Sequence, residues 1–285
     1  MIYIALSICC SIIVSVMLKL AKRYEIDVNQ AITWNYFMAI ILGLIFLKPD
    51  FRSLSPEPFP LYTALGILLP VIFIVIAAAV RQAGIIRTDI AQRLSLFLPL
   101  GASFFLFNEQ VSTYKVTGIL LGLTAIVCTI PRRTTDHPNH RNTGWWLLLL
   151  TFAGMGCIDI LFKEVALYRT VPYTTSLCVI YILAAIVSSA ISIGLILTGR
   201  SRLSWITIGC GWLLGIFNFG NILFYLKAHQ ALAQKPSVVF TSMNIGVIIL
   251  GTLVGYFVFK EKLTLVNKIG IILAVAAIII IASQQ

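Results

Sequence analysis

The chain has 285 residues, of which 59% are hydrophobic and 11% charged, and its mean hydropathy is +0.98. Soluble globular proteins carry about 25% charged residues, so this composition excludes an ordinary soluble domain and indicates an integral membrane protein. The formal net charge of +11 comes from basic residues scattered singly over the polar connections. That distribution is typical of loops that face anionic lipid and excludes a nucleic-acid-binding face.

Polar breaks divide the chain into ten apolar stretches, each close to the roughly 20 residues that a helix needs to cross about 30 Å of hydrocarbon. The stretches do not alternate apolar with polar residues, which excludes the strands of a membrane barrel. In chain order they lie near 2–21, 29–47, 60–80, 88–107, 113–131, 144–167, 172–197, 204–226, 236–259 and 264–283. The first has no basic segment before it, so we expect a retained span and not a signal peptide. The sequence therefore predicts an all-α integral membrane protein with ten transmembrane helices.

The longest polar segment, 132–143, divides these stretches into a first half, 1–131, and a second half, 144–285. The text FNEQVSTYKVTGILLGLTAIV begins at Phe107, and the similar text FKEKLTLVNKIGIILAVAAII begins at Phe259. Because each half has an odd number of crossings, the second half must enter the membrane from the opposite side. The predicted architecture is thus a pair of inverted five-helix repeats.

A Glu-containing turn of this kind, near the end of each half, resembles the drug/metabolite transporter superfamily and most of all its ten-helix EamA-type members. The residues that carry the resemblance are Phe107, Glu109, Gly118, Phe259, Glu261 and Gly270. Members often have Gly before the Glu, whereas this chain has Asn108 and Lys260. The resemblance covers roughly 3–130 and 144–282. It implies a transporter of the cell membrane that exports or exchanges a small molecule by alternating access, with a central cavity lined by spans one to four and six to nine.

Glu109 and Glu261 are expected to have a structural role at these turns. Each lies at a helix end close to basic residues. A carboxylate at the start of the following helix is stabilised by the helix dipole and can cap free N–H groups.

Two lysines, Lys19 and Lys163, occupy matching places in the halves, as do Gln82 and Gln230. Each lysine lies roughly 10 Å from the centre of its span at about 1.5 Å per residue, which is within the reach of a side chain that snorkels to the membrane surface. The inverted topology directs them to opposite surfaces. They are therefore either snorkelling residues or contacts at the two ends of a transport pathway.

Two charges lie deeper in the membrane. Asp159 is roughly 5 Å past the middle of span six, and Arg93 is roughly 6 Å before the middle of span four. Such groups are costly in a bilayer and usually face a bundle interior or a water-filled cavity. Pairing with Asp89 and with Lys163, each four residues away on the same helix, explains how they are tolerated. The functional interpretation is that Arg93 binds a substrate carboxylate, while Asp159 binds an amine or carries a proton.

Neutral polar residues in the apolar stretches complete the candidate binding site. Asn218, Asn221 and Tyr225 share one face of a helix by their spacing. That face either lines a cavity or makes hydrogen bonds between helices. The full set of neutral candidates is Asn35, Tyr36, Tyr181, Asn218, Asn221, Tyr225 and Asn244.

These features favour a secondary transporter for a small polar or amphipathic metabolite such as an amino acid, with a proton as the candidate coupling ion. All 6 cysteines lie in apolar stretches without metal-ligand spacing, so neither a metal nor another cofactor is expected. The alternatives are a membrane-embedded enzyme, a flippase for a lipid-linked substrate and a scaffold subunit. The protein is expected to be a monomer or a homodimer. Positive charge favours termini outside the cell, whereas the resemblance favours termini inside.

Overall fold

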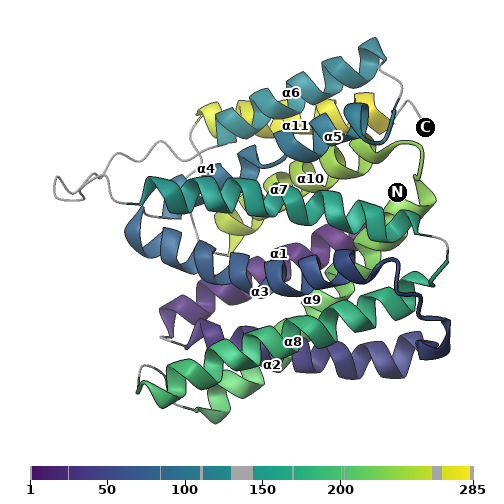
Figure 1. Cartoon of the computed structure of the whole chain (residues 1–285). Helices are drawn as coiled ribbons and strands as arrows, with labels where there is room; N and C mark the ends of the chain where they lie inside the picture. The colour runs from purple at the N-terminus through teal and green to yellow at the C-terminus, as the bar shows by residue number, and fades with distance from the viewer. Residues whose placement is uncertain are drawn as a thin grey trace.

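The computed structural model describes residues 2–24, 26–83, 85–109, 112–129, 144–168, 170–199, 201, 203–258 and 265–282, and the elements assigned in these ranges are helices (Figure 1). The predicted linker 132–143 and Glu261 lie outside these ranges. A π-helical turn, Gly43–Leu47, continues α2, and a short 3₁₀ turn, Phe51–Ser53, follows it. The α-helices are α1 (Ile2–Arg23), α2 (Val28–Leu42), α3 (Phe59–Gln82), α4 (Ile85–Leu94), α5 (Phe97–Phe105), α6 (Thr113–Thr129), α7 (Trp145–Leu167), α8 (Tyr173–Leu197), α9 (Trp205–Ala231), α10 (Pro236–Phe257) and α11 (Leu265–Ala282).

Six helical segments in the described ranges are long and apolar enough to cross a membrane. Three shorter apolar helices accompany them, at Ile2–Leu18, Val116–Ala125 and Lys268–Ala277. The prediction of an all-helical membrane protein is thereby confirmed. The six longer segments are Val28–Leu47, Phe59–Val80, Trp145–Leu167, Tyr173–Leu197, Trp205–Ala231 and Pro236–Phe257.

The predicted stretch 88–107 is divided into two short helices, α4 and α5. Pro99 explains the division, because a proline lacks the N–H of the regular helix and its ring clashes with the carbonyl four residues earlier, here that of Ser95. Leu98 N instead donates to Ser95 O at 3.0 Å, a tighter three-residue turn. A single proline thus sets the one interruption among the predicted stretches that the structure covers.

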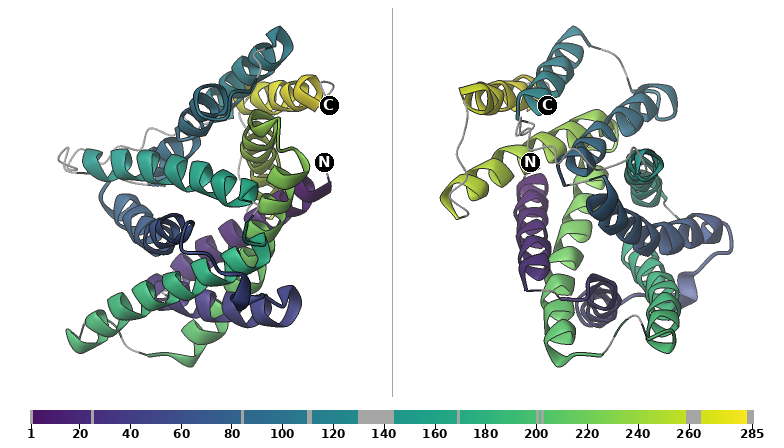
Figure 2. Two further views of the ribbon diagram at one scale, coloured as in Figure 1. Left: turned by 45° about the vertical axis from the view of Figure 1, so that its right-hand side comes forward. Right: turned by 90° about the vertical axis from the view of Figure 1, so that its left-hand side faces the viewer.

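The helices pack as neighbours that are distant in the sequence (Figures 1 and 2). α6 lies against α11 at one edge of the molecule, and α2 lies against α8 at the other. Between these edges, α2 packs on α9 and α8 packs on α3, while α1 packs on α9 and α7 packs on α3. α1 also contacts α10, and α7 contacts both α4 and α5. The main apolar core is formed between these helices by residues such as Ile32, Leu65 and Phe240.

Polar contacts join helix ends in two separate groups. At the end where the chain begins, which we call the N-terminal face, Tyr62 Oη lies 2.6 Å from Ser176 Oγ, and the Asp50 N–H donates to Thr175. At the opposite face, the Ser201 hydroxyl donates to Asp27 Oδ2 at 2.5 Å. Each face therefore holds the start of one helix against the end of another.

The close contact between α2 and α9 depends on glycine. A Cβ at Gly215 of α9 would lie 2.7 Å from the main-chain oxygen of Asn35 and 2.7 Å from Met38 Cβ, both in α2. Gly209, on the same helix, has open space around its Cβ position.

We expect Gly215→Ala to destabilise the protein by about 1–3 kcal/mol, because the added methyl group forces α2 and α9 apart. The matched change Gly209→Ala should be neutral or stabilising, since alanine is the better helix former by about 1 kcal/mol. Thermal unfolding of the two detergent-purified variants compares them directly. Equal transition temperatures would show that the α2–α9 contact does not need glycine.

Candidate functional site

A hydrogen bond between α7 and α9 brings together two of the predicted site residues. The Tyr225 hydroxyl of α9 donates to Asp159 Oδ1 of α7 at 3.0 Å. Tyr225 is buried, with its ring 6.4 Å from that of Phe162 in an edge-to-face arrangement. Asp159 is half-buried. In the described part of the chain Tyr225 is the hydrogen-bonding partner of this carboxylate, and no ion pair of Asp159 is found there.

Lys163 lies one helical turn after Asp159 but has a different partner. Its Nζ donates to the main-chain oxygen of Ala233, just beyond the end of α9, at 2.8 Å. The same Nζ lies 5.8 Å from the centre of the Phe107 ring. Lys163 is 0% exposed, so it does not snorkel to the protein surface. The pairing of Lys163 with Asp159 that helical spacing suggests is absent from this structure.

Glu109, directly after α5, holds the start of α10. Its Oε2 accepts the Ser237 N–H at 2.8 Å, and its Oε1 accepts the Ser237 hydroxyl at 2.6 Å. A carboxylate at this position satisfies a free N–H of the first helical turn and interacts favourably with the helix dipole. The carboxylate also acts electrostatically on the Lys163 ammonium. The sequence placed Glu109 at a cap of the following helix, and the structure shows its carboxylate capping α10.

His229 is a functional candidate that the sequence analysis did not single out. Its ring is fully buried, 4.6 Å from the Tyr225 ring and 4.7 Å from the Phe240 ring. Among the described residues, neither imidazole nitrogen has a hydrogen-bond partner. Leaving a buried polar group unpaired costs about 1–3 kcal/mol, so a bound molecule or water at these nitrogens would be stabilising. The available signal was its spacing, four residues after Tyr225.

A second group of predicted residues lies where α2, α8 and α9 meet. Asn218 Nδ2 donates to Asn35 Oδ1 at 3.1 Å. Tyr36 and Tyr181 are fully buried, and within the described ranges their hydroxyls have no partner. The Tyr181 ring lies 6.2 Å from the Phe219 ring. The hydrogen bond between the asparagines joins two helices, while the two tyrosine hydroxyls are buried close to that junction.

The other predicted residues lie apart from these groups. The Ser7 hydroxyl contacts Asn221, at 2.8 Å from Oδ1 and 2.9 Å from the main-chain oxygen, and so joins α1 to α9. Asn244 Nδ2 donates to Phe240 O of its own helix at 3.0 Å. Arg93 is half-buried in the last turn of α4. Lys19 belongs to α1, and its side chain is not among those that the structure describes.

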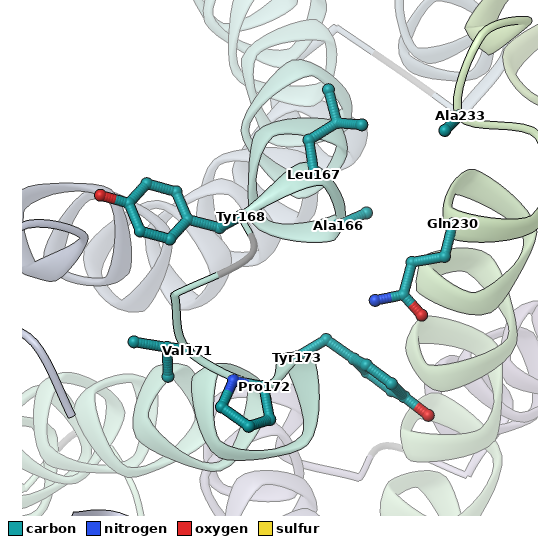
Figure 3. Close-up of a pocket in the computed structure, with 8 residues that line it drawn as sticks. All are labelled: Ala166, Leu167, Tyr168, Val171, Pro172, Tyr173, Gln230 and Ala233. Carbon is teal, nitrogen blue, oxygen red and sulfur yellow. The ribbon is translucent and has the colours of Figure 1, made fainter. Parts of the chain in front are cut away.

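A pocket of about 380 Å³ opens at the N-terminal face, between the end of α7, the start of α8 and the end of α9 (Figure 3). The Gln230 amide extends toward its interior. Its wall includes Ala233, the residue whose carbonyl binds Lys163. The pocket therefore adjoins the polar groups between α7 and α9. Its lining residues are Ala166, Leu167, Tyr168, Val171, Pro172, Tyr173, Gln230 and Ala233.

Comparison with known proteins places this fold in a family. No family model matches the chain. A protein of Haemophilus influenzae, described as uncharacterized, is 42% identical over 282 residues, which cover 95% of this chain and 94% of that protein. The chain belongs to the family of this Haemophilus protein. A crystal structure of a protein that shares 15% identity superposes with a TM-score of 0.76 and covers 99% of this chain and 96% of its own. At that identity the likeness establishes a shared fold alone, which extends over nearly the whole of both chains.

Proposed function

We propose that the protein is a secondary transporter of the EamA type, which moves a small polar or amphipathic metabolite across the cell membrane by alternating access. The observation that carries this proposal is the cluster formed by Asp159 of α7 with Tyr225 and His229 of α9. Inside an all-helical membrane protein, the Tyr225 hydroxyl holds a carboxylate, and a buried imidazole packs on the ring of the same tyrosine. Within the described ranges this imidazole has no hydrogen-bond partner. Ionisable groups at such a place usually mark a substrate or ion pathway.

The packing of the helices supports an inverted repeat of five spans in each half. Suppose that α1, α2, α3, the α4–α5 pair and α6 correspond to α7, α8, α9, α10 and α11. Exchanging each helix for its counterpart then converts the α2–α9 contact into the α8–α3 contact and the α1–α9 contact into the α7–α3 contact. The α1–α10 contact becomes the contacts of α7 with α4 and α5. A two-fold axis in the membrane plane produces this kind of exchange.

Individual residues follow the same exchange. Gly246 of α10 faces Ile8 of α1, and Gly156 of α7 faces Leu98 of α5. Both pairs of counterparts are 148 residues apart (156 − 8 and 246 − 98). In the first contact the glycine lies on α10 and the large residue on α1. In the second contact the glycine lies on α7, the counterpart of α1, and the large residue lies on α5, which belongs to the counterpart of α10. This complementary exchange is expected when two copies of one unit pack around a shared axis.

The Asp159 carboxylate is the proposed binding group for a substrate amine, or for the proton that drives transport. The Tyr225 hydroxyl fixes its orientation, and the rings of Phe162 and His229 pack against the Tyr225 ring. An amine held by a carboxylate and bordered by aromatic rings is stabilised by charge pairing and by cation–π attraction. A small amine-containing metabolite such as an amino acid therefore fits the group.

Counterflow into proteoliposomes tests this function. Liposomes containing the purified protein are loaded with a mixture of the common amino acids and simple amines, and uptake of each isotope-labelled solute is followed by mass spectrometry. We expect saturable uptake of at least one amine-containing solute above protein-free liposomes. Untargeted metabolite profiles of cells with and without the protein widen the search to other solutes. If neither measurement separates the protein from its absence, the transport proposal is wrong.

A further inference from the structure

We propose that Lys163 is the gate between the pocket at the N-terminal face and Asp159, and that its bond to Ala233 holds this gate closed. The inference rests on the proposed transport function, because it assigns Lys163 a place in the substrate pathway. It assigns Lys163 a movement, in addition to the binding chemistry proposed for Asp159.

The order of residues along two facing helices places Lys163 between the pocket and Asp159. On α7, Asp159, Lys163 and Leu167 follow at intervals of four residues, so they share one face and are spaced by about 6 Å along the helix. Asp159 is bound by Tyr225 of α9, whereas Leu167 lines the pocket. Lys163 occupies the level between them, where it binds the carbonyl of Ala233, another residue of the pocket wall. The bond therefore crosses the space between α7 and α9 at one level, with the pocket on one side and Asp159 on the other.

The partners of Lys163 allow this bond to break without isolating a buried charge. The acceptor is a single main-chain oxygen at the end of α9. Glu109 acts electrostatically on the same ammonium and is itself fixed to the start of α10. When the end of α9 moves away, Lys163 loses Ala233 but keeps the field of the Glu109 carboxylate. A charge-assisted hydrogen bond of this kind shifts a closed-to-open ratio by roughly tenfold to a hundredfold.

The gate also lies where both halves of the chain meet. Glu109 belongs to the first half, and Ala233 belongs to the second, as does Lys163 itself. Breaking the bond separates α7 from α9 at the N-terminal face, while the bond between Tyr225 and Asp159 deeper in the protein remains intact. That motion opens the pocket inward toward Asp159, as alternating access requires at one face.

Accessibility of introduced cysteines to a charged, membrane-impermeant methanethiosulfonate reagent tests the gate. Gln230→Cys reports on the pocket, and Asp159→Cys reports on the space beyond the gate. Each reporter is combined with native Lys163, with Lys163→Met or with the matched control Lys227→Met. The control removes a half-buried lysine of α9 that takes no part in the bond between Lys163 and Ala233. Peptide mass spectrometry quantifies modification at each position, so the native cysteines can stay.

We expect Gln230→Cys to react quickly in every background. Asp159→Cys should react slowly with Lys163 present and at least about tenfold faster with Lys163→Met, while Lys227→Met changes neither rate. If Lys163→Met does not elute as a monodisperse protein, Lys163→Gln serves instead, because its amide can still donate to Ala233, and a smaller acceleration is expected. Equal rates at the two reporters with native Lys163, or no acceleration by either substitution, would overturn the gate.

The labelling experiment needs no substrate, so its outcome is independent of the counterflow measurement. Transport with no change in labelling removes the gate and leaves the transporter. Faster labelling without transport of any solute supports the opening between α7 and α9 and contradicts the transport function.

Discussion

Replacing Glu109 with alanine should lower the free energy of unfolding by about 3–5 kcal/mol, because it removes two buried hydrogen bonds to a charged group, each worth about 1.5–3 kcal/mol. The carboxylate accepts two hydrogen bonds from Ser237, and both atoms of Ser237 lie in the buried first turn of α10. In the alanine variant this turn loses its cap, and the buried ammonium of Lys163 loses the nearby negative charge. Both losses act on the same junction of α5, α7 and α10.

A series of variants separates these two losses. Glu109→Gln keeps an acceptor for Ser237 but removes the charge, whereas Ser237→Ala removes the hydroxyl and keeps the charge. If the charge of Lys163 matters, the double variant Glu109→Ala with Lys163→Met should be less destabilised than the two single effects together predict. Glu57→Ala, an exposed acid at the same face that accepts one hydrogen bond from the Tyr168 hydroxyl, should change stability by no more than about 1 kcal/mol. Thermal and denaturant unfolding in detergent give the comparison, and strict additivity would contradict a network.

The helices of this fold were predictable because their signal is local. Continuous apolar text of about 20 residues specifies a membrane helix whatever its neighbours are, and the division of 88–107 also has a local cause in Pro99. The partners of the polar residues were not predictable in this way. Glu109 caps a helix whose first turn is 128 residues away in the sequence, and no rule of spacing along one helix supplies that contact.

Lys163 shows why local rules also gave the wrong partner. Spacing of four residues on α7 favours a pair with Asp159, a contact worth about 0.2–0.5 kcal/mol on an exposed helix. In the folded protein the ammonium is fully buried, so it needs a desolvated partner, and Ala233 O supplies one across the helix interface. His229 was passed over for a related reason. Its place near the end of its helix does not reveal that Phe240 of α10 packs against it.

In the proposed inverted repeat, the separation of the two glutamates differs by four residues from that of the counterparts in the packing. Glu109 and Glu261 are 152 residues apart (261 − 109), whereas the counterparts at the α1–α10 and α5–α7 contacts are 148 apart (156 − 8). Four residues are about one helical turn, so the difference adds a turn without rotating a helix face by much. Under the proposed repeat such an insertion would be tolerated, because the same helix face would continue to point at its partner.

Replacing Asp159 with asparagine should reduce counterflow by roughly a hundredfold, the cost expected when one partner of a desolvated charge pair is removed. The substitution keeps the size of the side chain and its ability to accept the Tyr225 hydroxyl, so the contact between α7 and α9 persists. What it removes is the negative charge that would bind an amine or carry a proton. Folding should be unaffected, since a neutral side chain is easier to bury than a carboxylate.

The variants around Asp159 distinguish charge from geometry. Asp159→Glu retains the charge and should keep partial activity, while Tyr225→Phe should reduce counterflow by roughly tenfold, since it removes one hydrogen bond to a charged group. Glu164→Gln is the comparison variant, because it makes the same acid-to-amide change on α7 five residues further along, where the carboxylate acts on Lys163 and not on the Tyr225 hydroxyl. Counterflow at equal amounts of reconstituted protein measures all four. Full activity of Asp159→Asn would show that the carboxylate takes no part in transport. Equal losses of counterflow in Asp159→Asn and Glu164→Gln would show that the total charge of α7 matters and not the position of the Asp159 carboxylate.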